Sequence, residues 1–393
     1  MTEHTNTPEL RFPVFKGEWE EKKLGDIGVF RKSYSFSRAK EGEGIYRHIH
    51  YGDIHSKLPE IVYDNNLLPQ IKENKDFVKV QKGDLIFADA SEDYDDLGKA
   101  ITLDFNPQNI IAGLHTHLFT LEKNYDNKFL VNYTKTNKYR TFIRQVGTGI
   151  SVLGISKKSL SNFNILTPFI DEQEKIGDFF SKLDRQIELE EEKLELLEQQ
   201  KRGYMQKIFS RELRFKDDNG NGYPDWEETT IKNITNYINS KKSSNQYNES
   251  NNSEGYPVYD AIQEIGKDLQ YDMKEPYISI LKDGAGVGRL NLRAGKSSVI
   301  GTMGYIQAIN VDIQFLYYRM KLLNFRKFII GSTIPHLYYK DYSKEKILIP
   351  TSNDEQKKIG HFILNIDKLI DNKTLKLDYL KQRKQGLLQK MFI

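Results

Sequence analysis

Cysteine is absent from this 393-residue chain, which excludes both a disulfide scaffold and a metal site built on thiolates. The chain also lacks an uninterrupted apolar run of the length that a membrane-spanning helix needs. Its first eight residues, Met1 to Pro8, are polar and have no apolar stretch of the kind found in signal peptides. We therefore expect a soluble, cytoplasmic protein that does not associate with membranes.

An excess of charge of one sign is missing as well. The chain has 58 basic and 55 acidic residues, a formal net charge of +3, which is too small to indicate nucleic-acid binding by itself. Hydrophobic residues make up 38% of the chain and aromatic residues 12%, which is enough to form buried cores. The length predicts two or three domains.

A long internal repeat organises the chain. Residues 171–209 and 354–392 align without a gap at an offset of 183, and 18 of these 39 positions are identical. Both copies begin with Asp-Glu-Gln-x-Lys-Ile-Gly, follow a proline (Pro168 or Pro350) and contain no proline themselves. Because proline is tolerated just before a helix but not inside one, each copy is predicted to be one long helix.

Each predicted helix carries apolar residues at alternating steps of four and three, the 3.5-residue period of a coiled coil. The first helix has net charge −4 (7 basic, 11 acidic residues) and the second +4 (9 basic, 5 acidic), which favours an antiparallel coiled coil between them. The residues predicted to pair the helices are Ile176, Phe180, Leu183, Ile187, Glu190, Leu194, Leu197, Ile359, Ile363, Ile366, Ile370, Lys373, Leu377 and Leu380.

The repeat extends beyond the helices. Glu9-Leu10-Arg11-Phe12 recurs at 212–215, the only two tryptophans (Trp19 and Trp226) occupy matching places, and Gly147, Ile150 and Leu153 match Gly331, Ile334 and Leu337. We predict a pseudo-twofold α/β (mixed α+β) protein with two strand-rich globular domains in tandem. The expected boundaries are 1–168 and 211–350 for the domains and 169–210 and 351–393 for the helices. Strands are expected at 77–80, 83–87, 277–281 and 346–349.

In this layout the chain resembles the specificity (S) subunits of type I restriction–modification systems. The matching phrases are Pro8-Glu9-Leu10-Arg11-Phe12, the segment Trp19 to Ile27, Gly83-Asp84-Leu85-Ile86-Phe87, both helix starts, and Leu388-Gln389-Lys390-Met391-Phe392. The resemblance covers the whole chain, and the order and duplication of the phrases are more specific than any one of them.

The resemblance implies that each domain reads one half of a bipartite site in double-stranded DNA, while the helices set the half-site spacing. It also implies two methyltransferase (M) subunits docked on the helices and two restriction (R) subunits. The chain itself would be non-catalytic and carry no cofactor, whereas the partner subunits would use S-adenosylmethionine, ATP and Mg²⁺.

Other motifs were weighed as catalytic or ligand sites. The methyltransferase motif Asn/Asp-Pro-Pro-Tyr/Phe is absent, and Gly295-Lys296-Ser297 has Leu290 where a phosphate-binding loop needs glycine. The run Gly284 to Arg289 ends in arginine, so it fails the dinucleotide fingerprint and favours a tight loop between strands.

Three groups of candidate metal ligands were also considered. Asp217 to Glu228 matches a calcium-loop pattern, although Pro224 and the repeat role of Trp226 favour a linker. The histidine pairs His48/His50 and His115/His117 lack an evident third zinc ligand. The acidic run from Asp89 to Asp96 lacks a nuclease-like lysine. We expect no metal site.

Candidate DNA contacts are donor side chains in loops and at strand ends. In the first domain they are Arg38, Lys40, Arg47, His48, Tyr51, Tyr94, Lys99, His117, Arg140 and Arg144; in the second they are Lys241, Lys242, Tyr259, Gln263, Lys282, Arg289, Arg293 and His336. Two alternatives remain: a scaffold in which the coiled coil joins two ligand-binding domains, or a stand-alone DNA-modifying enzyme whose catalytic motif is not recognised.

Overall fold

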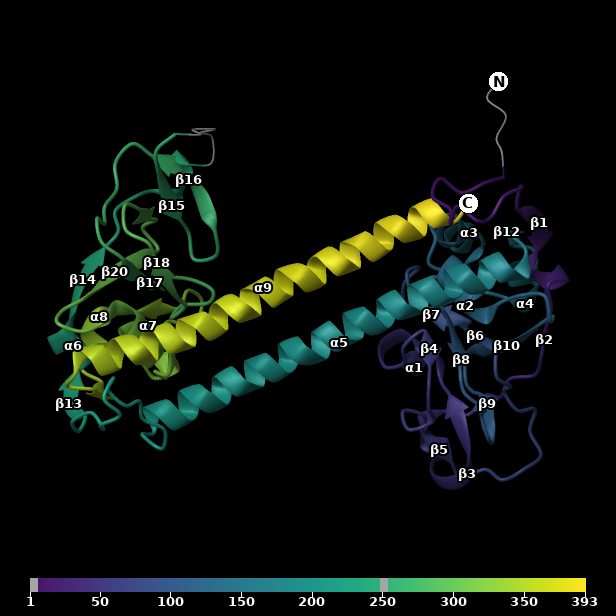
Figure 1. The fold of residues 1–393 in the computed structure, drawn as a ribbon, viewed down its shortest axis with the longest axis horizontal. Coiled ribbons are helices and arrows are strands. Elements are labelled where there is room, and N and C mark those ends of the chain that lie inside the picture. Colours follow the sequence, from purple (N-terminus) through teal and green to yellow (C-terminus); the bar gives the residue numbers. More distant parts are fainter. Residues whose placement is uncertain (1–5, 248–253) are drawn as a thin grey trace. The chain divides into compact units, whose positions relative to one another are not determined.

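The computed structural model describes residues 6–247 and 254–393. It divides into two compact units, each combining one strand-rich globular region with parts of both long helices (Figure 1). The first unit comprises the described residues up to Glu192 together with Leu375–Ile393, and the second comprises Lys193–Thr374. None of the helices formed by the described residues combines the length and apolar character needed to cross a membrane.

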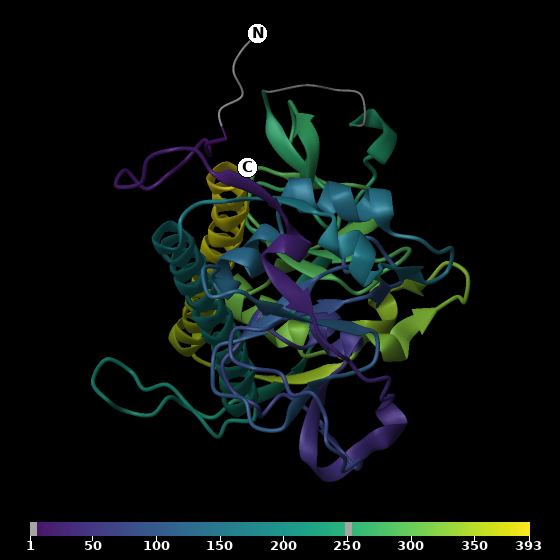
Figure 2. The same cartoon turned by 90° about the vertical axis from the view of Figure 1, so that its right-hand side faces the viewer.

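The first unit is built on a five-stranded sheet of order β2-β10-β6-β8-β4, with a three-stranded sheet β5-β3-β9 and the pairs β1–β12 and β11–β7. Figure 1 shows β3 and β5 at the end of this unit away from α5, and Figure 2 shows the unit from the side. The strands are β1 Glu20–Lys23, β2 Gly28–Phe30, β3 Glu41–Ile49, β4 Ile61–Val62, β5 Gln70–Ile71, β6 Leu85–Ala88, β7 Ala90–Ser91, β8 Ala100–Leu103, β9 Ile110–Ala112, β10 Thr116–Leu121, β11 Leu153–Gly154 and β12 Asn164–Thr167. The short helices are α1 Tyr51–Ser56, α2 Asn127–Tyr133, α3 Asn137–Val146 and α4 Lys157–Ser161.

The second unit repeats this plan with a four-stranded sheet β14-β20-β17-β18, a three-stranded sheet β16-β15-β19 and the pairs β13–β23 and β21–β22. Its strands are β13 Glu227–Thr230, β14 Thr235–Asn239, β15 Tyr256–Tyr259, β16 Glu264–Asp268, β17 Tyr277–Leu281, β18 Leu290–Arg293, β19 Ser298–Val299, β20 Met303–Ala308, β21 Ile329–Ile330, β22 His336–Leu337 and β23 Lys346–Ile349. Its short helices are α6 Ile231–Ile234, α7 Ile313–Lys321 and α8 Tyr339–Tyr342.

Both long helices form as predicted, α5 over Ile170–Phe209 and α9 over Asn353–Met391. Each begins on its own domain through the same contacts, because the side chain of Gln173 or Gln356 accepts a hydrogen bond from the residue that caps α2 or α7. The distances are 3.1 Å from Asp126 N and 2.8 Å from Asp312 N. The repeat identified in the sequence is therefore a structural repeat.

A glycine allows this close approach. A Cβ on Gly177 would lie 2.9 Å from the backbone nitrogen of Phe129, and one on Gly360 would lie 2.8 Å from that of Phe315. Such contacts are too short for any side chain, so glycine at this position lets the start of α2 or α7 rest directly on the long helix.

The far end of each long helix completes the core of the other repeat's domain. In the first unit, Phe392 packs against Phe129 at a ring-centroid distance of 5.0 Å and against Trp19 at 6.4 Å. In the second unit, Phe209 packs against Trp226 at 6.4 Å. The far ends of both helices thus belong to these cores, and in the first unit that end comes from the opposite end of the chain.

Ion pairs join α5 and α9 in both units, and in the first unit they run in antiparallel order. There Asp184 pairs with Lys384 and Glu190 with Lys376 at 3.1 Å; in the second unit Lys201 pairs with Asp367. The predicted seam residues are buried or half-buried, including Ile187 and Ile366. Oppositely charged residues of the two helices thus form ion pairs, as their net charges indicated. The knobs-into-holes packing of a coiled coil remains a prediction.

Two details of the sequence analysis were wrong. Residues 77–80 form no strand: Phe77 is buried in an aromatic cluster with Tyr34 at 4.8 Å, and Val78 N donates to the Tyr34 hydroxyl at 2.8 Å, so side-chain packing replaces a ladder. The strands expected near 83–87, 277–281 and 346–349 are confirmed as β6, β17 and β23.

The second error concerns the loop alignment that paired Gly147 with Gly331. The backbone nitrogen of Ile155 donates to Asp89 O, just after β6. In the second unit the equivalent hydrogen bond, just after β17, runs from Leu337 N to Lys282 O, so Leu337 corresponds to Ile155 and not to Leu153. The correct offset is 182, which matches Gly149 with Gly331 and Val152 with Ile334. The repeated Gly-x-x-Ile-x-x-Leu pattern in the sequence concealed this shift of two residues.

Candidate nucleic-acid interface

The first group of candidates lies around β3 and α1, where most cations are already paired. Arg38 donates to both carboxylate oxygens of buried Asp53, at 2.8 and 3.1 Å, and Lys40 pairs with Glu73 at 2.9 Å. Arg47 donates to the backbone carbonyl of Leu68. Arg38, Arg47 and Asp53 line a hollow of about 400 Å³ on the surface. The hydrogen bond to Asp53 raises the pKa of Arg38.

His48 is a buried residue, which does not favour its predicted role as a DNA contact. Its side chain is fully buried, and Nε2 lies 3.1 Å from Glu41 Oε1. Burial lowers the pKa of His48 and, together with Arg38, lowers the pKa of His50 to about 4. His48 on β3 and His50, which caps α1, are therefore both buried and do not form an exposed polar face.

Two further candidates mainly hold loops in place. Arg140 donates to the carbonyls of Thr134, Asp95 and Leu97 at 2.9, 2.8 and 3.0 Å, which fastens α3 to the acidic loop. His117 has Nε2 at 2.9 Å from Ile155 O. Both side chains have a structural role that the sequence did not indicate, because their partners are backbone carbonyls.

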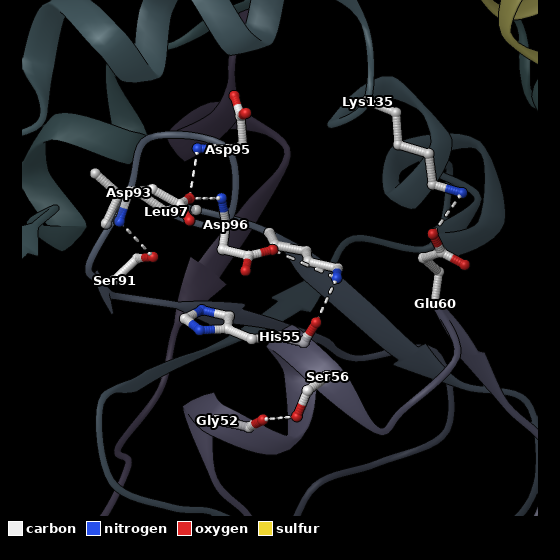
Figure 3. Close-up of polar contacts among 12 residues, drawn as sticks. Gly52, His55, Ser56, Glu60, Ser91, Asp93, Asp95, Asp96, Leu97 and Lys135 are labelled. Atoms are coloured by element: carbon white, nitrogen blue, oxygen red, sulfur yellow. Dashed lines mark hydrogen bonds and ion pairs between the residues drawn. The ribbon is translucent and has the colours of Figure 1, made fainter. Parts of the chain in front are cut away.

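The remaining candidates of the first unit gather beside the acidic loop 89–96. Figure 3 shows this loop folded on itself: Asp93 accepts from the backbone nitrogens of Asp95 and Asp96 at 2.9 and 2.8 Å. Lys99 donates to His55 O at 3.1 Å, and Arg144 pairs with Asp95 at 3.0 Å. The rings of Tyr51 and His55 meet at 5.4 Å.

Half-buried Tyr94 belongs to this loop as well. The sequence analysis gave no DNA role to His115, whose ring lies 5.3 Å from Tyr51. Its backbone φ of 51° is rare for a residue other than glycine, and no pattern in the sequence predicts it.

In the second unit the candidates form two groups. Residues 282–289 join β17 to β18 as a tight loop, with positive φ at Gly284, Gly286 and Gly288. At this loop Lys282 pairs with Asp283, His336 Nδ1 lies 2.7 Å from the same carboxylate, and Arg289 is exposed. The predicted loop between strands is confirmed.

The second group surrounds β15. Arg293 stacks on Tyr259 at 4.1 Å and donates to Asp260 O at 3.0 Å, while Lys242 pairs with Asp268 at 2.5 Å. Lys241 and Gln263 are exposed. The only donors of this group that project into solvent are therefore these last two.

The motifs weighed as metal sites are occupied by internal contacts. Asp217 Oδ1 accepts from the backbone nitrogens of Asn219 and Asn221 at 3.0 and 2.7 Å, and Asp218 pairs with Lys358 at 2.7 Å. Within residues 6–247 and 254–393, three or more His, Asp and Glu side chains are nowhere grouped so as to hold a metal ion.

A charged cavity between the first domain and the long helices was missed by the sequence analysis. It has a volume of about 500 Å³, and its lining includes Glu60, Lys135, Asp184 and Lys384. Glu60 accepts from Lys135 at 3.2 Å, as Figure 3 shows, and Asp184 pairs with Lys384. Burial alone would raise the pKa of Glu60, but Lys135 and Lys384 outweigh it and lower that pKa to about 2.

We predict that the ion pairs of Glu60 make the stability of the first unit sensitive to acid. Because the pKa of Glu60 is about 2 in the folded protein and 4.5 ordinarily, its ion pairs stabilise the fold above pH 4.5 and lose this effect as the pH falls toward 2. Thermal unfolding measured between pH 6 and pH 2.5 should show a smaller decline for Glu60→Gln than for the wild type. Parallel declines would contradict the assignment, and Glu92→Gln, at an exposed site, is the control.

Two tandem strand-rich domains, each leading into a long helix, define a protein built by internal duplication. The family model described as the type I restriction modification DNA specificity domain matches the chain twice, at residues 16–199 and 223–382. The chain belongs to this family, as its sequence indicated, and it is the specificity component of such a system rather than a catalytic one.

Individual relatives agree with this assignment. The type I restriction enzyme MjaVIII specificity subunit of Methanocaldococcus jannaschii is 28% identical over 200 residues, which span 47% of this chain and 46% of that protein. The putative MjaX specificity subunit of the same organism is 23% identical over 94% of this chain and 92% of its own. The first alignment thus spans about half the relative's length.

Among solved structures, the crystal structure of the type I restriction–modification system S subunit from M. genitalium is similar in fold. It has a TM-score of 0.69 and 17% identity, and the match covers 98% of this chain and 99% of that one. At this identity the similarity supports the fold alone, which confirms the predicted layout of two mixed α/β domains and two long helices.

Proposed function

We propose that this chain reads a bipartite site in double-stranded DNA, one half with each globular domain. The duplication carries the proposal: the long helices and their docking contacts repeat closely, whereas the loops beside β6 and β17 differ completely, one acidic and the other glycine-rich. A common frame with divergent loops is what a protein needs to present two different reading surfaces to one duplex.

The long helices provide the spacing and the docking surface in this proposal. They set the separation of the half-sites and bind two methyltransferase subunits, to which two restriction subunits are added. S-adenosylmethionine, ATP and Mg²⁺ would serve those subunits. Because most cations in the candidate interface are paired with carboxylates, DNA binding by this chain alone is expected to be weak.

Methylation mapping tests the proposal. DNA from cells that co-express this chain and its methyltransferase partner should carry methyladenine in both strands of a split motif, detected by single-molecule sequencing. Replacing residues 213–350 with the second domain of another family member should change one half of the motif and leave the other half unchanged.

Two outcomes would contradict the proposal. A stable complex that methylates no DNA would favour the scaffold alternative, and a domain replacement that changed both halves would refute independent reading. Methylation by the isolated chain would instead favour the stand-alone enzyme.

A further inference from the structure

Matching apolar side chains are exposed at the same place in both domains. After the corrected alignment, Val152 corresponds to Ile334, and their exposed fractions are 59% and 57%. Each stands in a short loop between paired segments. An exposed β-branched residue is unremarkable alone, but the same exposure at equivalent positions of two divergent domains indicates a shared use.

The two loops are built in the same rigid way. Gly149 has φ 135° and Gly331 has φ 93°, and a Cβ on either would collide with the carbonyl oxygen of Val152 or Ile334, at 2.0 and 2.4 Å. Thr148 and Gly154 exchange two backbone hydrogen bonds of 3.0 and 2.7 Å across the first loop, and β21 pairs with β22 across the second. The exposed side chain is therefore held in place before any partner binds.

Each loop is fixed beside the segment in which the two domains diverge. The contacts are the backbone hydrogen bonds from Ile155 to Asp89 and from Leu337 to Lys282, at 2.9 and 2.8 Å. A ligand that contacts one of the divergent loops can therefore also reach the exposed apolar side chain beside it, Val152 or Ile334. The residues of the tips, 148–153 and 331–335, include none with charge and four with hydroxyl groups, so no carboxylate there repels phosphate.

We propose that Val152 and Ile334 are equivalent, sequence-independent DNA contacts, each packing its apolar side chain into the minor groove next to the bases that the divergent loop reads. Apolar side chains commonly enter the minor groove in this way, with hydroxyl and backbone donors facing the phosphates. An alternative is that the two equivalent side chains dock two identical methyltransferase subunits. That alternative does not explain why the loops beside them differ between the domains. The inference rests on the proposed function.

The test compares Val152→Ser, Ile334→Ser and the double variant with the wild-type full chain. Binding is measured by fluorescence anisotropy at one fixed salt concentration, on a duplex carrying the mapped split motif and on the same duplex with both halves scrambled. Each substitution should weaken binding about tenfold, as expected for losing a buried aliphatic contact, and by the same factor on both duplexes. The control Val14→Ser, at an apolar site that is 78% exposed and belongs to no candidate interface, should bind as the wild type does.

Each other outcome overturns the inference. If the double variant binds DNA as the wild type does, the two side chains do not contact DNA. If the variants change the methylation motif, the side chains read bases. If the methyltransferase no longer co-purifies with the variants, the side chains belong to a protein-docking surface. The proposed function fails separately, since it requires the wild-type chain to direct methylation to a split motif.

Discussion

Deletion of residues 388–393 should unfold the first unit while the second unit stays folded. Leu388, Met391 and Phe392 are at most 5% exposed and belong to the same core as Trp19, Phe129 and Phe180. Losing a buried Leu, Met or Phe side chain costs about 2–5 kcal/mol, so three together remove about 6 kcal/mol or more, which is comparable to the whole stability of a typical domain.

Hydrogen bonds at this end of α9 add to the effect. The Tyr133 hydroxyl donates to Ile393 O at 2.7 Å, and Leu10 N donates to Lys390 O at 2.8 Å. Limited proteolysis with mass spectrometry should find cleavage throughout residues 20–167 of the deletion variant and protection of 223–350. The matched control, Tyr379→Ala on the same helix at a 62% exposed site, should be cleaved like the wild type. Protection of both units after the deletion would show that the first core does not need this segment.

The long helices were predictable because their signal is strong and local. A 3.5-residue period without proline over some 40 residues permits one structure, and α5 and α9 begin within a residue or two of their predicted starts. The docking of their far ends was not predictable, since Phe392 and Trp19 are separated by almost the whole chain and no pattern links them.

The candidate interface was predicted less well, for a physical reason. Sequence shows which side chains can donate hydrogen bonds but not which are already occupied by internal partners. Arg38 is held by Asp53, Arg140 by three carbonyls, and His48 is enclosed in the β3 sheet. The shifted loop alignment has a similar origin: residue identity favoured one offset, and only the backbone hydrogen bonds revealed the other.

Removal of Arg214 should destabilise the second unit by about 3 kcal/mol, because it leaves a buried carboxylate without its partner. Arg214 donates to both oxygens of Glu355, at 3.1 and 2.8 Å, and Glu355 is fully buried. The first unit has the equivalent pair, in which Arg11 donates to Glu172 at 2.7 and 2.6 Å. Glu172 or Glu355 is the second residue of each Asp-Glu-Gln helix start, so the pair joins the segment before each tryptophan to its long helix.

A double-mutant cycle measures this pair. Thermal and urea unfolding of Arg214→Met should show the full loss, whereas Arg214→Met with Glu355→Leu should recover most of it, because an apolar pair of similar volume replaces the ions without an uncompensated charge. Lys346→Ala, which breaks the exposed pair with Glu228, should leave the unfolding curve unchanged. If Arg214→Met unfolded like Lys346→Ala, the Arg214–Glu355 pair would not contribute to the stability of the second unit. The repeat of this contact in both units would then need an explanation other than stability.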